Sequence, residues 1–326
     1  MNHSNKTEKS FKLLAVETAT SEVGAAIISG GRQLLALTHR TSDHHVEELF
    51  LMIDQLLADS GSDLSEMDAF AVDVGPGLFT GLRVGIAAAK TLAYGLGKTV
   101  VPVSGTEVLS KALERKVIDD CADDSSVCGR LVLSVPVLDV RRGEVAFVIN
   151  SPFLCCPPGQ ISSGEINSFD HLDAFSVSKD SHTVGLQPHL EETLGIGIIR
   201  LATPEHFSKL LAEVISAIFA SKSSGAVSDA TDVEYLRDWQ LVLAGGGASR
   251  YRSQIRQALD AAFGELGDHL VFYEDMDAAP VGILGEVAYR EFCRGLALEP
   301  SMVKPIYLRE ADAKAGAWKG AVTKET

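Results

Sequence analysis

Few residues in this sequence are of types and spacings that could do chemistry, and its nine histidines are the first to consider. No two stand four residues apart, so neither H-x-x-x-H nor H-E-x-x-H, the helical spacings that bring two imidazoles to one zinc ion, occurs. The dense stretch HRTSDHHVEE (residues 39–48) could bind a metal loosely, but its composition favours a solvated start of a helix. The G-x-S-x-G pattern of a nucleophilic serine is also absent. The sequence therefore predicts no metal site and no catalytic residue.

Two carboxylates and a run of glycines sit where α/β folds often bind ligands. Asp73 and Asp139 each end a strand-like segment, a position that catalytic carboxylates often occupy, although a capping or turn role suits each equally well. The glycines of LVLAGGGAS (residues 241–249) would let a nucleotide approach the backbone between a strand and a helix. Tight packing of that strand on that helix explains them equally well, so both alternatives stay open.

The stretch DVGPGLFTGLRVGIAAAK, from Asp73 to Lys90, has the most unusual spacing. It matches neither the P-loop, which needs Gly-Lys-Ser/Thr, nor the G-x-G-x-x-G dinucleotide fingerprint. Gly81, Gly85, Ala89 and Ala93 recur every four residues, which places a strip of very small side chains along one helix. Such a strip favours close packing, inside the fold or with a partner, over the alternative of an anion nest at the helix start.

Composition and charge exclude several classes of protein. The chain has 326 residues, enough for two domains, with 29 Lys and Arg against 44 Asp and Glu and a net charge of -15. This acidity should repel a nucleic-acid backbone, so any RNA would be held by a partner. Five cysteines without metal-like spacing indicate reduced thiols and a cytoplasmic protein. No apolar stretch has the length of a membrane span.

Hydrophobic periodicity predicts the elements that must position these residues. Strands are expected over residues 11–18, over 22–29 and 32–40 with a turn at Gly30-Gly31, over 68–75 and over 98–104. Helices are expected over 45–59, capped by Asp43, and over 79–96. The resulting order is β-β-β-α-β-α-β, and the second half repeats strand, glycine loop and helix more loosely.

Composition shifts predict where the domains begin and end. We expect a disordered leader (1–10), an N-terminal domain (11–105), a C-terminal α/β domain (106–312) and a mobile tail (313–326). Turn-rich and linker-like composition predicts an insertion around residues 151–240 of the C-terminal domain.

Four segments together resemble the TsaB/YeaZ family, and they occur in the family's order. They are LLAVETATSEVGAAII, VGPGLFTGLRVGIAAAKTLAYGLGKTVVPVS, LDVRRGEVAFV and KPIYLRE. The match lapses between about residues 150 and 240. The resemblance implies two ribonuclease-H-like domains of the actin/Hsp70/sugar-kinase type. It also implies a non-catalytic subunit that activates TsaD for N6-threonylcarbamoyl transfer to adenosine 37 of ANN-decoding tRNAs. TsaE would be a further partner, TsaC would act upstream, and tRNA would be bound only through the complex.

The residues of this chain depart from the active members of that fold. Those members open with Asp-x-Gly after the first strand, where this chain has Glu17-Thr18-Ala19. The departure weighs against a small-molecule kinase, and the missing histidine pair weighs against an M22-type glycoprotease-like metallopeptidase, which are the two alternative functions. No intrinsic cofactor is expected, apart from weak ATP or ADP binding at the partner interface. The expected remnants of a nucleotide site are Glu17, Thr18, Gly75, Gly77, Asp139, Gly245 and Gly246.

The resemblance further implies that the helices over 45–59 and 79–96 pair with the equivalent helices of TsaD. The same surface would serve a homodimer in the absence of TsaD, because an exposed apolar patch of this kind tends to be covered. The residues expected at this interface are His45, Glu48, Leu49, Leu51, Met52, Phe79, Leu82, Arg83, Gly85, Ile86, Ala89 and Lys90.

Overall fold

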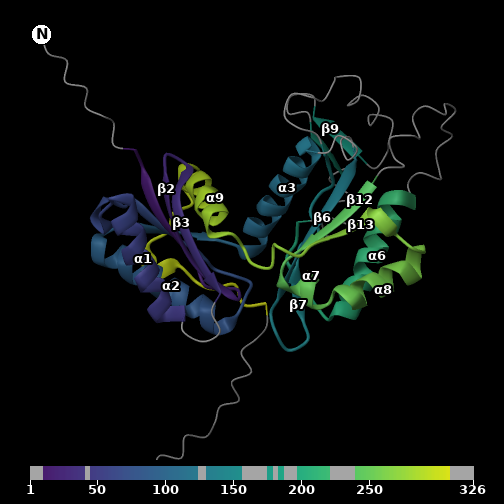
Figure 1. Ribbon diagram of the computed structural model, residues 1–326, viewed down its shortest axis with the longest axis horizontal. Helices are drawn as coiled ribbons and strands as arrows, with labels where there is room; N and C mark the ends of the chain where they lie inside the picture. Colours follow the sequence, from purple (N-terminus) through teal and green to yellow (C-terminus); the bar gives the residue numbers. More distant parts are fainter. Residues whose placement is uncertain are drawn as a thin grey trace, which may run out of the picture.

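A computed structural model describes residues 10–40, 45–123, 130–155, 175–178, 183–186, 197–220 and 239–308. The leader up to residue 9, the tail after residue 308 and the predicted cap Asp43 lie outside these ranges. The chain forms two α/β lobes that lie side by side, with helix α3 between them (Figure 1). Among the helices in the described ranges, none is both long and apolar enough to cross a membrane.

The first lobe follows the predicted order β-β-β-α-β-α-β. Its sheet has the strand order β3-β2-β1-β4-β5, in which β1 pairs antiparallel with β2 and parallel with β4. This mixed order is that of a ribonuclease-H-like domain, as predicted. The elements are β1 (Lys12–Glu17), β2 (Glu22–Ser29), β3 (Arg32–Arg40), α1 (His45–Ser60), η1 (Leu64–Glu66), β4 (Ala69–Asp73), α2 (Phe79–Leu96) and β5 (Thr99–Val103).

The second lobe repeats this topology. Its sheet has the order β11-β7-β6-β12-β13, with antiparallel pairs from β11 to β6 and parallel pairs from β6 to β13, and β8 pairs with β6. The predicted duplication of α/β domains is therefore confirmed at the level of strand order. The elements are α3 (Gly105–Asp123), β6 (Leu131–Asp139), β7 (Val145–Phe147), β8 (Phe153–Leu154), β11 (Arg200–Ala202), α6 (Pro204–Ala220), β12 (Trp239–Ala244), α7 (Gly246–Arg250), α8 (Arg252–Phe263), η3 (Gly267–His269) and β13 (Leu270–Tyr273). A separate hairpin joins β9 (Phe175–Ser178) and β10 (Thr183–Leu186).

Helix α9 (Val281–Cys293) corrects the predicted domain division. We assigned residues 106–312 to the C-terminal domain, but the chain returns and α9 packs on strands β1 and β2 of the first sheet. The alternation of side chains along β1 explains the return, since Leu14 and Val16 face the core under α1 and α2 while Leu13 and Ala15 face the opposite side. That second apolar face needs its own cover, and α9 supplies it.

The predicted insertion around residues 151–240 is also corrected. Strand β11 and helix α6 fall within that range, yet β11 pairs with β7 at the edge of the second sheet. Helix α6 buries Phe207, Leu211, Val214 and Ile215 in the core of this domain together with strands β6 and β12. Both elements therefore belong to the domain itself. The rest of the predicted insertion is described only at residues 151–155, in the hairpin and from residue 197 onward.

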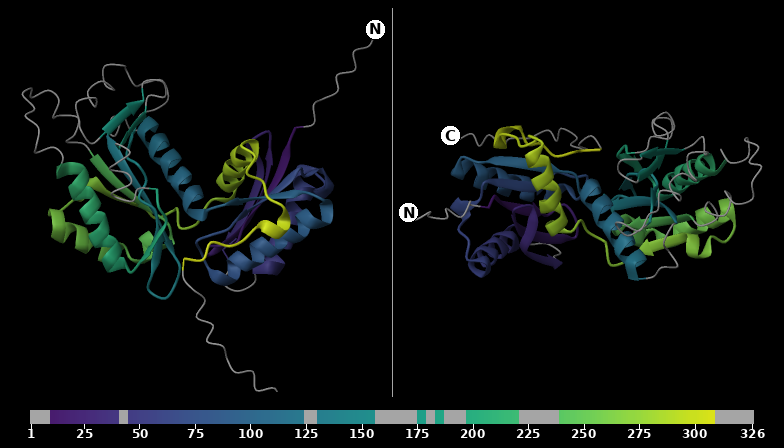
Figure 2. Two further views of the ribbon diagram at one scale, coloured as in Figure 1. Left: turned by 180° about the vertical axis from the view of Figure 1, so that it is seen from behind. Right: turned by 90° about the horizontal axis from the view of Figure 1, so that it is seen from above.

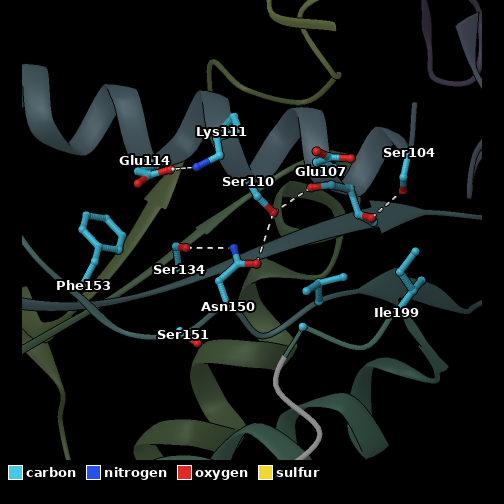
Figure 3. A pocket seen from close by; sticks show the side chains of 13 residues that line it. Ser104, Glu107, Ser110, Lys111, Glu114, Ser134, Asn150, Ser151, Phe153 and Ile199 are labelled. Atoms are coloured by element: carbon cyan, nitrogen blue, oxygen red, sulfur yellow. Dashed lines mark hydrogen bonds and ion pairs between the residues drawn. The ribbon is translucent and has the colours of Figure 1, made fainter. Parts of the chain in front are cut away.

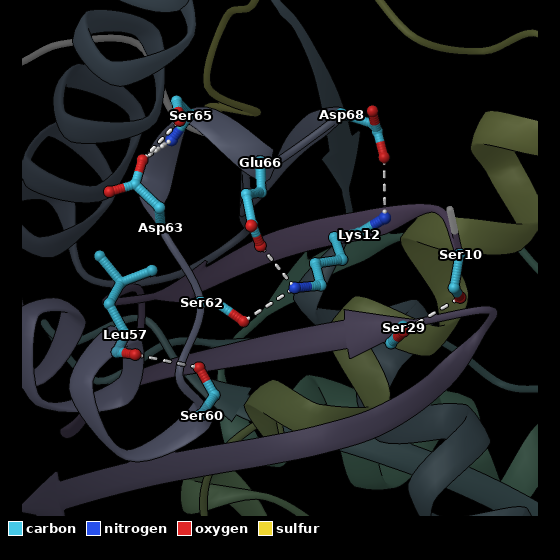
Figure 4. Close-up of polar contacts among 10 residues, drawn as sticks. All are labelled: Ser10, Lys12, Ser29, Leu57, Ser60, Ser62, Asp63, Ser65, Glu66 and Asp68. Carbon is cyan, nitrogen blue, oxygen red and sulfur yellow. Dashed lines mark hydrogen bonds and ion pairs between the residues drawn. The ribbon is translucent and has the colours of Figure 1, made fainter. Parts of the chain in front are cut away.

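A polar cluster fixes the start of β1 to the segment between α1 and β4 (Figure 4). The Lys12 ammonium donates to Glu66 Oε2 at 2.6 Å and to Ser62 Oγ at 3.0 Å, and the Lys12 backbone N–H donates to Asp68 Oδ2 at 2.9 Å. Because the Lys12 and Glu66 side chains are only partly buried, the ion pair mainly fixes geometry and adds little stability.

The strip of small residues on α2 lies inside the protein. Gly81, Gly85 and Ala89 are buried, and a side chain at Gly81 or Gly85 would collide with Thr18 at the end of β1. The Thr18 hydroxyl donates to the backbone oxygen of Gly81 at 2.7 Å. The strip therefore exists because α2 must lie directly on the end of β1. Of the explanations left open by the sequence, close packing within the fold is confirmed.

Replacing Gly81 by alanine should destabilise the protein by about 1–3 kcal/mol, because the new methyl group has no room against the backbone of Thr18. The matched control is Gly95→Ala on the same helix, where nothing lies within 4 Å of the added carbon. This control should be neutral or more stable by up to about 1 kcal/mol, since alanine is the better helix former. Urea unfolding of the two variants measures the contrast, and equal stabilities would contradict the proposed close approach.

Candidate functional site

A cavity of about 260 Å³ lies between the two lobes, at the carboxyl ends of β1 and β6. It brings together three of the predicted nucleotide-site remnants, namely Gly77, Asp139 and Gly246. Glu17, Thr18, Gly75 and Gly245 do not line it. The other lining residues are Ala19, Thr20, Ser21, Leu78, Leu138, Arg141, Arg250 and Asp277.

The charges around this cavity are paired with one another. Asp139 accepts from the Arg250 guanidinium at 2.9 Å and lies 3.7 Å from that of Arg141. Asp277, in the segment that returns from β13 to α9, accepts from Arg40 of β3 at 2.9 Å. Sequence reasoning missed Arg250 and Asp277, since no local motif marks a pairing partner that lies 111 or 237 residues away.

Backbone donors that a phosphate would need are already used within the fold. The N–H groups of Ala19 and Thr20 donate to Glu17 Oε1 at 2.7 and 3.2 Å, so the carboxylate of Glu17 takes the place of an anionic ligand in this turn. The Leu78 N–H donates to the Ala19 oxygen at 2.6 Å, and the Gly246 N–H donates to the Asp277 oxygen at 2.8 Å. The glycine loop therefore packs on the turn after β1 and does not form an anion nest.

Glu17 and Asp73 form a buried pair of carboxyl groups at the ends of the adjacent strands β1 and β4. Both side chains are almost completely inaccessible to solvent. Asp73 Oδ1 accepts from the Gly75 N–H at 2.6 Å, while Asp73 Oδ2 and Glu17 Oε2 have no hydrogen-bond donor. Two carboxylates cannot donate to each other, but one proton would join them by a hydrogen bond.

Burial raises the pKa of both groups, because it disfavours the charged form. The pKa of Glu17 lies well above its usual range, first through burial and then through the charge of Asp73 and the hydrogen bond shared with it. Burial raises the pKa of Asp73 to about 6, although the hydrogen bonds from Glu17 and the Gly75 and Gly105 amides oppose the increase. The pair therefore holds a proton well above the pH at which exposed carboxyls lose theirs.

A second cavity, of about 500 Å³, runs along α3 in the second lobe (Figure 3). Its polar side chains bond mainly to one another: Asn150 Nδ2 donates to Ser134 Oγ at 2.9 Å, and Lys111 pairs with Glu114 at 2.6 Å. No residue predicted as a site from the sequence lines it. Among the described residues, no group of three or more His, Cys, Asp or Glu side chains could hold a metal ion.

The predicted interface residues divide into two sets. Leu49, Leu82, Gly85, Ile86 and Ala89 are buried in the first lobe, so the prediction that they face a partner is wrong. They face inward because α1 and α2 need this side to cover the sheet. Other members of the set lie nearer the surface. Leu51, Phe79 and Arg83 are exposed, Met52, Glu48 and Lys90 are half-buried, and the side chain of His45 lies outside the described residues.

The outer sides of α1 and α2 form an apolar groove of about 460 Å³, called here the α1–α2 groove. Phe50 stands on one helix, and Phe79, Arg83, Val84 and Ala87 stand on the other; Thr80, Ala88 and Thr91 complete the lining. The side chains of Phe50, Leu51 and Phe79 are 39%, 69% and 47% exposed. Exposed apolar side chains on neighbouring helices are typical of a surface that binds a partner. Phe50 was not among the residues predicted for the interface.

The carboxyl pair predicts a pH-dependent effect of Glu17→Gln. The amide oxygen can still accept from Ala19 and Thr20, while its NH₂ group can donate to Asp73 Oδ2, which no longer needs the shared proton. Groups with a raised folded-state pKa stabilise the protein below about pH 4 and lose that contribution as the pH rises through about 6. The variant should therefore gain about 1–3 kcal/mol over the wild type between pH 4.5 and pH 8.

Urea unfolding at several pH values measures this gain. Asp59→Asn, a change at an exposed carboxyl group of α1, is the matched control and should run parallel to the wild type. A stability difference between Glu17→Gln and the wild type that is constant with pH would show that the two carboxyls do not share a proton.

Comparison with known proteins yields relatives over part of the chain. A family model described as TsaD, tRNA N6-adenosine threonylcarbamoyltransferase, matches residues 38–118. The tRNA threonylcarbamoyladenosine biosynthesis protein TsaB of Haemophilus influenzae is 37% identical over 106 residues, which are 32% of this chain and 44% of that protein. A tRNA N6-adenosine threonylcarbamoyltransferase of Moorella thermoacetica is 38% identical over 107 residues, 28% of this chain and 31% of that enzyme. The chain thus spans less than half the length of these relatives.

Solved structures extend the similarity of the fold to both lobes. A Pseudomonas aeruginosa structure titled YeaZ aligns with a TM-score of 0.52 and 20% identity, covering 91% of this chain and all of the other. A protein described as similar to the peptidase YEAZ from the same organism gives the same score over 92% of this chain. At this identity the alignment supports the fold alone. The chain therefore has the fold of the YeaZ structures, and part of its sequence is similar to TsaB and to the TsaD family.

Proposed function

We propose that this protein is a non-catalytic subunit in the synthesis of threonylcarbamoyladenosine on tRNA, and that it binds and activates TsaD. The proposal rests on the hydrogen bonds that the backbone amides make in the cleft between the lobes. The amides that would hold a phosphate bond instead to Glu17, Ala19 and Asp277. A domain related to a transferase but lacking a free phosphate cradle is suited to binding a partner.

The α1–α2 groove is the surface we propose for TsaD. The TsaD family model matches residues 38–118, which include both α1 and α2, so the equivalent helices of TsaD resemble these two. Two similar helix pairs can pack face to face about an approximate twofold axis, as in an isologous dimer. The exposed Leu51 and Phe79 would supply the apolar centre of this contact.

The charge of the chain supports a role for the partner in holding tRNA. A net charge of -15 opposes the approach of a phosphate backbone. Transfer to tRNA therefore requires a second protein that binds the nucleic acid, and that protein is TsaD in this proposal.

The purified chain alone should transfer no threonylcarbamoyl group to unmodified tRNA, and addition of its TsaD should produce transfer. The measurement is incorporation of labelled threonine into tRNA in the presence of the upstream synthase TsaC, the ATPase TsaE and ATP. A control reaction contains TsaD and the other proteins without this chain. Robust transfer by the chain in the absence of TsaD would instead assign the transferase activity to the chain itself.

Leu51→Glu should leave the fold intact and weaken binding to TsaD. The side chain is 69% exposed in the free protein, so a carboxylate is tolerated there. In a dry interface the unpaired charge should cost about 2 kcal/mol or more, which is roughly thirtyfold in Kd. Pull-down on immobilised TsaD measures the loss, and a melting curve verifies the fold.

The matched control is Leu296→Glu, a leucine of similar exposure (53%) that follows α9, on the other face of the first sheet. This variant should bind TsaD as the wild type does. Normal binding by Leu51→Glu would refute the outer side of α1, next to the α1–α2 groove, as part of the docking surface.

A further inference from the structure

The segment after α9 is an extended strap that lies along the first lobe, and Figure 2 shows it as the yellow segment crossing this lobe. It starts at the short helix η4 (Pro300–Met302) and runs to residue 308 without forming a strand. The strap is anchored at two places. The Val303 side chain is buried in the core under α2, and its backbone oxygen accepts from Lys90 at 3.2 Å. The Ile306 N–H donates to the Val74 oxygen at 2.7 Å.

These anchors place the next residue, Tyr307, beside the first turn of α2. The rings of Tyr307 and Phe79 have their centroids 5.4 Å apart. The guanidinium of Arg83 lies over the Phe79 ring, 3.7 Å from its centroid, and Arg83 Nε donates to the Tyr307 hydroxyl at 3.2 Å. Each of the three side chains therefore contacts the other two, and we call them the Tyr307 cluster.

The three side chains of the Tyr307 cluster are exposed to solvent, although each of them contacts the other two. Phe79 and Tyr307 are 47% and 46% accessible, and Arg83 is also on the surface. Little hydrophobic stabilisation comes from rings that remain half in water. Phe79 and Arg83 also line the α1–α2 groove, whereas Tyr307 does not. The strap thus reaches the groove only through these two side chains.

We infer that Tyr307 is a positioning residue for partner binding, because it fixes Phe79 and Arg83 in one arrangement at the entrance of the α1–α2 groove. The inference rests on the proposed function, since the occupant of the groove is taken to be TsaD. It assigns a role to the segment KPIYLRE, which no predicted site included.

The physical reason is the entropy of ordering side chains at an interface. A free arginine and an exposed phenylalanine sample several rotamers, and a partner that binds one of them must order both. A cluster that is ordered before the partner arrives avoids this cost, so loss of Tyr307 should weaken TsaD binding about tenfold. The stability of the lobe should change little, because the strap keeps its anchors at Val303 and Ile306.

The test uses the full chain and its TsaD, with Kd measured by isothermal titration calorimetry. Tyr307→Ala should bind about tenfold more weakly at an unchanged melting temperature. Tyr307→Phe keeps the ring contact with Phe79 and loses only the hydroxyl that accepts from Arg83, so its affinity should lie between those of Tyr307→Ala and the wild type. The control is Tyr94→Ala, at an 83% exposed tyrosine near the other end of α2 and outside the groove, which should bind as the wild type does.

A double-mutant cycle separates positioning from a direct contact of Tyr307 with TsaD. If Tyr307 acts partly through Arg83, then Tyr307→Ala should cost less affinity in an Arg83→Ala background than in the wild type. Fully additive effects would overturn the inference, and so would wild-type affinity of Tyr307→Ala, while the proposed function would stand in both cases. Failure of the wild-type chain to bind TsaD would refute the proposed function and the inference with it.

Discussion

The structure depends on the direct contact between helix α2 and the end of strand β1. Gly81 and Gly85 let the helix reach the backbone and hydroxyl of Thr18, a distance at which no side chain fits. The hydrogen bond from Thr18 to the Gly81 oxygen fixes the helix at this depth. The glycine loop between β4 and α2 must then fold over the turn after β1, where the Leu78 N–H bonds to the Ala19 oxygen. Close helix packing therefore also determines what happens in the cleft.

The packing of α2 on the end of β1 also determines how the cleft between the lobes is built. In this cleft the chain places the carboxyl group of Glu17 against its own backbone and next to Asp73. Burying two negatively charged carboxylates side by side destabilises the folded protein, so the pair tends to retain a proton. Arg250 and Arg40 pair with the acids at the rim. The acidic groups at the rim of the cleft are thus paired within the protein, while the outer side of the first lobe, at α1 and α2, leaves apolar groups exposed.

Local sequence patterns predicted the first lobe well because every element there has a strong periodic or turn signal. The bounds of α2 agree with the predicted 79–96, and the hairpin turn lies at Gly30-Gly31. The strip on α2 was recognised as a packing surface, but periodicity could not tell whether a strand or a partner lay against it. Helix α9 was assigned to the wrong lobe, since its partner strands lie more than 250 residues earlier in the chain. The Asp277 and Arg250 pairings were missed for the same reason.

The return of α9 has a consequence for biosynthesis. A ribosome that has released all five strands of the first sheet has still to translate nearly 180 residues before α9 is available to cover one face. Until then Leu13, Ala15, Ile28 and Val101 present an apolar surface to the solvent or to a chaperone. The nascent first lobe is therefore complete only when the second lobe has emerged. Folding of this protein cannot proceed strictly from the N-terminus, and the two lobes are synthesised as nested, not consecutive, units.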